Sequence, residues 1–144
     1  MGRLTVDGLD GLMDDLAALA ALPDSVVERI LDAEADVILP VQREEMKRQW
    51  SGPHSLGISS KSIKKGKVKK DKDGRSLSIY PQGTRKRGGQ TIRNAEIAFI
   101  NEYGAPRRGI PARPAIDTAN KKKESEAVDA GERVYHAYLD SKNL

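Results

Sequence analysis

The sequence predicts an α+β fold with N-terminal helices, a small antiparallel β-hairpin or sheet, and a long C-terminal helix packed on it. Two patterns predict this class. Apolar side chains recur at spacings of three and four near both ends of the chain, which indicates amphipathic helices, whereas short alternating runs in the middle indicate strands. Strands grouped between helices favour α+β over a parallel α/β sheet. The length of 144 residues suits a single domain, 1–144.

Two helices are expected at the start of the chain. An N-terminal helical arm covers 1–22, because the apolar residues of 9–20 form one stripe that Pro23 ends. A second helix is expected over 24–50. Inside it, Pro40 lacks a backbone N–H donor, so we expect either one bent rod or two separate pieces.

The middle of the chain predicts one hairpin and one loop. A basic β-hairpin is expected over 64–81, because Asp73-Gly74 separates two short alternating runs, as in many two-residue hairpin turns. The next segment, 82–92, is rich in glycine, lysine and arginine and offers little apolar surface to bury. We therefore expect it to be a flexible basic loop.

Two further helices are expected in the C-terminal third. A short apolar helix covers 93–104, and Gly104 ends it. A linker that contains prolines leads to Pro114, which suits the first turn of a helix. A long helix is then expected over 114–140, with apolar residues on one side and lysines and glutamates on the other.

The small net charge of +4 is a cancellation between segments of opposite sign. Residues 1–50 carry a net charge of −6, residues 61–93 carry +10, and residues 94–144 are neutral. Such segregation indicates nucleic-acid contact or electrostatic docking between neighbouring subunits, although charged hairpins and loops are also commonly solvated faces. Tyr80 is the only aromatic residue in the basic stretch, so any DNA binding should be non-specific. The candidate interface or DNA-contact residues are Lys64, Lys65, Lys67, Lys69, Lys70, Arg85, Lys86 and Arg87.

No pattern of catalytic or metal-binding residues stands out. The lack of cysteine excludes thiolate zinc sites and Cys nucleophiles, and His54 and His136 have no sequence neighbours typical of a triad or a metal site. The glycines of 83–91 have the spacing of a phosphate-binding loop, but Gly89 and Gln90 stand where Lys and Ser or Thr are needed. We expect no enzyme activity, no cofactor and no metal. Short apolar runs and the lack of a secretory signal predict no membrane contact.

Segments 94–105 and 110–116 carry a family resemblance. Glu102-Tyr103-Gly104 ends one predicted helix, and Ala112-Arg113-Pro114 leads into the next. This order resembles the HK97 gp10-like family of tailed-bacteriophage head–tail connector, or neck (tail-completion), proteins. Upstream, 57–63 is similar to the family's Gly-Leu-x-x-Ser-Ile element.

The resemblance implies a structural virion protein of a tailed bacteriophage. Such a protein forms a homo-oligomeric ring of six or twelve copies in the virion neck, joins the DNA-filled head to the tail, and assembles in the host cytoplasm. The implied partners are a head-closure or adaptor protein and a tail-tube or tail-terminator protein, with non-specific contact to viral DNA in the lumen. Two alternatives stay open: a tail terminator or head-closure subunit of the same connector, and a small non-specific DNA-binding protein that uses the basic hairpin and loop.

The motif residues are expected to set a structural corner rather than to perform chemistry. Gly104 permits a positive φ, the prolines stiffen the linker, and Glu102 is expected to pair with Arg113 across the turn. The chain has Ala115 where the family often has Phe, so the pocket for that ring must be filled otherwise or left open. The corner residues are Glu102, Tyr103, Gly104, Pro111, Arg113 and Pro114.

Overall fold

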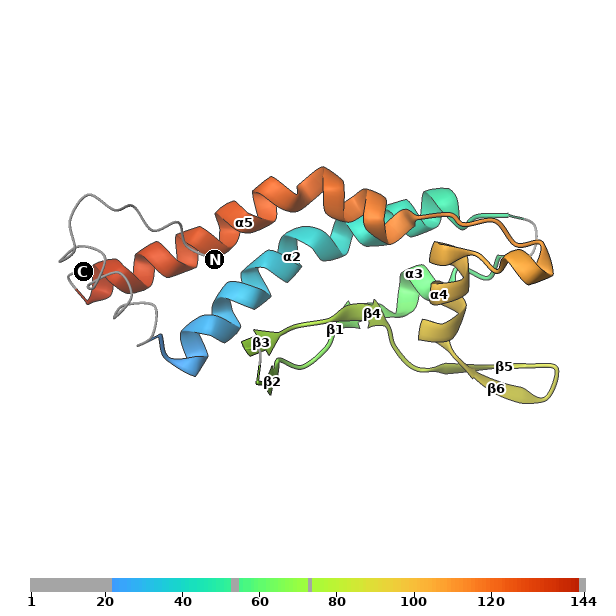
Figure 1. Cartoon of the computed structure of the whole chain (residues 1–144), viewed down its shortest axis with the longest axis horizontal. Coiled ribbons are helices and arrows are strands. Elements are labelled where there is room, and N and C mark those ends of the chain that lie inside the picture. Colours follow the sequence, from blue (N-terminus) through green and yellow to red (C-terminus); the bar gives the residue numbers. More distant parts are fainter. Residues whose placement is uncertain (1–21, 53–54, 73, 143–144) are drawn as a thin grey trace.

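Two long antiparallel helices run the length of the molecule (Figure 1). Helix α2 covers Asp24–Gln49 and helix α5 covers Ala115–Ser141, and they form the largest contact between any two elements. Small side chains line this contact, because Ala35 on α2 and Ala119, Ala127 and Ala130 on α5 are all buried. Their small size lets the two helix backbones approach closely.

The computed structural model describes residues 22–52, 55–72 and 74–142. The predicted class is confirmed, since helices combine with small antiparallel sheets and the long C-terminal helix packs on α2. The predicted arm over 1–22 lies, apart from Leu22, outside the described residues. Within the described residues, no helix is both long enough and apolar enough to cross a membrane.

Helix α2 runs through Pro40 without a break. Of the two outcomes that Pro40 allows, the structure has the single rod, and Figure 1 shows its axis changing direction midway. Helix α5 contacts α2 on both sides of Pro40, at Glu34 before it and at Gln42 and Glu45 after it, so packing holds the helix together where one backbone hydrogen bond is lost.

A two-part ribbon lies on the side of α2 that faces away from α5 (Figure 1). Strand β1 (Ile63–Lys65) pairs with β4 (Ile79–Pro81), and further out β2 (Lys69–Asp71) pairs with β3 (Gly74–Ser76). Both pairs are antiparallel, and together they form the hairpin expected over 64–81. Ile63 is fully buried against α2, which fixes this ribbon to the helix.

The prediction of a flexible loop over 82–92 is wrong, because this segment forms a second hairpin. Strand β5 (Thr84–Arg87) pairs with β6 (Gln90–Arg93) in antiparallel register. The turn is Gly88-Gly89, with φ of 57° and 80°, and two adjacent residues with positive φ suit the twist of a tight hairpin. The hairpin forms without an apolar face, since the glycine pair sets the turn and backbone hydrogen bonds pair the strands.

Three short helical elements complete the fold at one end of the helix pair. They are α3 (Ile58–Ser62), α4 (Asn94–Tyr103) and the 3₁₀ turn η1 (Pro106–Arg108). The main hydrophobic cluster lies where α2, β1, α4 and α5 meet, and its members are Met46, Trp50, Ile63, Ala98 and Ala115. Ala115 is fully buried in this cluster, so neighbouring side chains fill the space that a larger residue would take.

Candidate functional site

The corner between α4 and α5 is held by a buried carboxylate. Glu102, at the end of α4, is 5% exposed and accepts hydrogen bonds from the backbone N–H groups of Ile116 (2.8 Å) and Asp117 (3.0 Å). These are two of the amides that the first turn of α5 leaves without a helical partner. A negative charge there also interacts favourably with the helix dipole. Glu102 is therefore the N-terminal cap of α5, supplied from another helix.

The predicted pairing of Glu102 with Arg113 is wrong. Both Glu102 oxygens face α5, and the Arg113 guanidinium instead donates to Asn101 Oδ1 (2.9 Å) and to the Gln49 carbonyl (3.2 Å). The Arg113 carbonyl accepts the indole N–H of Trp50 at 2.7 Å. Arg113 thus ties the linker both to α4 and to the end of α2.

Gly104 allows the chain to turn sharply at the end of α4. Its φ is 75°, and a methyl group at this position would lie 2.7 Å from the Ala112 nitrogen and 2.8 Å from the Ile110 oxygen. Because both atoms belong to the backbone, they have little freedom to move away. Glycine is therefore required here for conformation and for space.

The remaining corner residues are on the surface. Tyr103 is 65% exposed, Pro111 is exposed, and Pro114 is the exposed residue that precedes α5. Trp50 and Asn101 also belong to the corner, because both form hydrogen bonds with Arg113, but they are not among the residues predicted from the sequence. The sequence could have predicted a hydrogen bond from Trp50, because a buried indole N–H needs an acceptor. It does not indicate that the acceptor is the Arg113 carbonyl.

An open groove of about 1100 Å³ lies beside the corner, between the end of α2, α3, β5 and α4. Its lining includes five cationic residues, and none of the described residues that line it is acidic. Leu56, Ile58 and Ile97 add apolar surface, and the Leu56 side chain is 70% exposed. The cationic residues are Lys47, Arg85, Lys86, Arg87 and Arg113. We call this region the cationic groove.

The charges of the cationic groove are mostly uncompensated. Arg85 donates to Asn94 Oδ1 (2.8 Å) and Ser59 Oγ (3.3 Å), so its partners are neutral, as are those of Arg113. Burial, and next the nearby Arg87 charge, lower the pKa of the Arg85 guanidinium from its ordinary value. Lys86 and Arg87 are exposed and form no ion pair with any described residue. The groove is therefore suited to an anionic partner.

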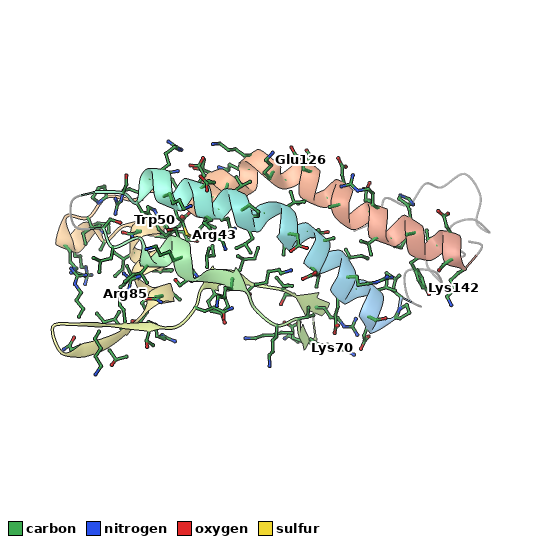
Figure 2. All side chains as sticks on the ribbon, turned by 180° about the vertical axis from the view of Figure 1, so that it is seen from behind. Arg43, Trp50, Lys70, Arg85, Glu126 and Lys142 are labelled. Carbon is green, nitrogen blue, oxygen red and sulfur yellow. The ribbon has the colours of Figure 1, made fainter. Side chains whose placement is uncertain are left out.

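The other predicted basic residues lie elsewhere. Figure 2 shows Arg85 and Trp50 at one end of the molecule, Lys142 at the opposite end, and Lys70 between them on the β2–β3 part of the ribbon. Lys65 is half-buried and pairs with Asp32 (2.5 Å) and Asp36 (2.7 Å) of α2, which raise the pKa of its ammonium group. Lys64, Lys67, Lys69 and Lys70 are on the surface. The stretch with net charge +10 is thus two separate groups, and one of its lysines is neutralised within the chain.

The buried carboxylate of Glu45 makes the stability of the fold depend on pH. Glu45, on α2, accepts hydrogen bonds from Lys122 of α5, from Gln49 (3.1 Å) and from Arg48 (2.5 Å). These contacts, the one with Lys122 foremost, lower its pKa from 4.5 to about 2. The folded state therefore holds this proton less tightly than the unfolded chain does.

We expect Glu45 to stabilise the fold fully above about pH 4.5 and to lose this contribution as the pH falls toward about 2. Urea unfolding of Glu45→Gln should show a clear loss of stability at neutral pH that shrinks in acid. Glu44→Gln is the matched control, because Glu44 is exposed and only pairs with Lys47, so its loss should matter little at either pH. A constant difference between Glu45→Gln and the unaltered chain across this range would contradict the assignment.

Two aromatic rings lie exposed on α4. Phe99 and Tyr103 are one helical turn apart, with ring centroids 4.8 Å from each other, and they are 62% and 65% exposed. Of the two histidines, His136 is exposed beside Tyr135, and His54 lies outside the described residues. The described residues contain no group of three or more His, Cys, Asp or Glu side chains that could hold a metal ion.

No family model matches the sequence, and neither a curated protein nor a solved structure matches the chain.

Proposed function

We propose that this chain is a structural virion protein of a tailed bacteriophage, one subunit of a ring in the neck that joins the DNA-filled head to the tail. The observation that carries the proposal is the corner. The residues by which the sequence resembles the connector family, Glu102, Gly104 and Arg113, are the ones that join α4, α5 and α2. A motif of this kind fixes the relative positions of three helices. A subunit of an assembly needs such a fixed structure, because its contact surfaces must have the same geometry in every copy.

The surface supports an assembly role. A closed ring needs a heterologous interface, in which two different patches on each subunit complement one another. The cationic groove is one candidate patch, and the exposed Phe99–Tyr103 pair on α4 is another, since exposed aromatic residues are enriched at protein interfaces. Both lie at the same end of the molecule as the corner (Figure 1).

The proposal predicts that the purified chain assembles, and that the mass of the assembly is six or twelve times that of one chain. Native mass spectrometry and negative-stain electron microscopy should show closed rings of six or twelve copies at micromolar concentration. Phe99→Ser combined with Tyr103→Ser should reduce the ring fraction without unfolding the subunit, because both rings are exposed. Val128→Ser is the matched control, since Val128 is an exposed apolar residue on α5 (48%). A wild-type chain that stays monomeric would contradict the ring.

A second candidate function is non-specific DNA binding, favoured by a group of six exposed basic residues on the two hairpins. Phosphate binding by such residues produces an affinity that falls steeply with salt. The members of this group are Lys64, Lys67, Lys69, Lys70, Lys86 and Arg87.

One pair of substitutions separates the two functions. We expect Lys86→Ala with Arg87→Ala to impair ring assembly while changing the affinity for duplex DNA by less than about twofold. Arg85 is left unchanged because it holds Asn94 and Ser59 within the fold. The control, Lys69→Ala with Lys70→Ala, removes the same charge from strand β2 of the other hairpin, away from the cationic groove. Rings that persist while DNA affinity collapses would favour the DNA-binding function.

A further inference from the structure

We infer that the cationic groove binds residues 1–21 of a second copy of this chain. This inference extends the proposed function by naming the contact between neighbouring subunits. It rests on the proposed function only in that repeated contacts of this kind close into a ring. The groove is lined by both apolar and cationic side chains and is open to solvent. Its partner should therefore be a segment with an apolar face and an acidic one.

Residues 1–21 have this chemistry. Their side chains carry one basic residue, Arg3, against four aspartates, a net charge of −3. The apolar residues Leu9, Leu12 and Leu16 recur at helical spacing, and Asp7, Asp10 and Asp14 recur at the same spacing on the opposite side. An apolar face would enter the groove beside Leu56 and Ile97, and the long side chains of the exposed cations that line the groove would extend to the aspartates.

The distances indicate that this segment binds the groove of another copy rather than the groove of its own chain. Pro23 directly precedes α2, whereas the groove lies beside Met46 and Trp50, about 33–39 Å away along the helix. The helix that the sequence predicts over 9–20 would be only about 18 Å long, and the three residues between it and α2 span about 10 Å at most. Such a helix would not reach the groove of its own chain. Its binding to a neighbour's groove is a heterologous contact, of the kind that generates rings.

The test uses two variants of the chain 1–144. The groove variant carries Leu56→Asp, Lys86→Glu and Arg87→Glu, all at exposed positions. The segment variant carries Leu12→Asp and Leu16→Asp. Each variant keeps one intact half of the proposed interface, so we expect each alone to be monomeric by analytical ultracentrifugation, with self-association weakened at least about tenfold.

Mixing the two variants is the decisive step. The intact segment of the groove variant should enter the intact groove of the segment variant, and this dimer cannot grow further because its other two surfaces are altered. Lys69→Glu with Lys70→Glu is the matched control and should assemble like the unaltered chain. Circular dichroism melting curves verify that every variant is folded.

The outcomes separate this inference from the proposed function. A one-to-one dimer in the mixture supports the docking of 1–21, even if the unaltered chain forms no closed ring, which would overturn the neck ring alone. Folded variants that stay monomeric when mixed, beside wild-type chains that form rings, overturn the docking and leave the ring standing. Rings that persist in either variant also overturn the docking, as does a segment that binds within its own chain.

Discussion

Gly104→Ala is expected to destabilise the fold more than any other substitution of a small residue in the corner. The new methyl group would lie 2.7 Å from the Ala112 nitrogen and 2.8 Å from the Ile110 oxygen. The strained φ of 75° adds to this contact, and together they should cost about 3 kcal/mol or more in the free energy of unfolding. Chemical denaturation at neutral pH measures the difference.

Gly109→Ala is a matched control for this substitution. Gly109 also has a positive φ, 69°, but a methyl group there would meet nothing within 4 Å. We expect it to cost only about 1 kcal/mol, because its ψ of 22° lies in the left-handed helical region, which alanine can adopt, whereas Gly104 has a ψ of 178°, in a region that is essentially restricted to glycine. Equal losses from the two variants would show that the packing of Gly104 against the linker does not hold the corner.

Glu102→Ala is expected to be the next most damaging change, at about 3 kcal/mol. It leaves the N–H groups of Ile116 and Asp117 without their acceptor at the start of α5 and removes a charge that the helix dipole favours. Glu102→Gln keeps one carbonyl acceptor and should cost roughly half as much. Denaturant unfolding, together with hydrogen exchange at Ile116 and Asp117, locates the effect.

Glu96→Ala is the control for Glu102. Both residues are glutamates of α4, but Glu96 is exposed and its side chain only pairs with Arg93 at 2.7 Å. Exposed pairs of this kind contribute little, so we expect a change below about 0.5 kcal/mol. If Glu102→Ala were as mild as Glu96→Ala, the cap on α5 would not be what joins the two helices.

The spacing of apolar residues predicted the two long helices well, because each of them buries only one face. The helix expected over 24–50 is Asp24–Gln49, and the one expected over 114–140 is Ala115–Ser141. Each has an apolar stripe that the other helix buries, so the local pattern and the tertiary contact agree. The hairpin Thr84–Arg93 has no such stripe, and only the pair Gly88-Gly89 could have revealed it.

The sequence identified the residues of the corner but did not predict which groups they contact. Pairing Glu102 with Arg113 followed the rule that opposite charges attract, whereas in the structure the free amides of α5 take both oxygens of the carboxylate. Charge alone does not indicate which backbone groups a fold leaves without partners. The cationic groove was equally hidden, since Lys47 and Arg113 are far in sequence from Arg85 and meet it only through the packing of α2, α3 and α4.

Electron microscopy of tailed particles that contain this chain tests whether it is a subunit of a neck ring. A reconstruction of such particles locates each copy of the chain. We expect a closed ring of six or twelve copies between head and tail, with density for residues 1–21 of a neighbouring copy in each cationic groove. Single copies, or copies located away from the junction of head and tail, would contradict it.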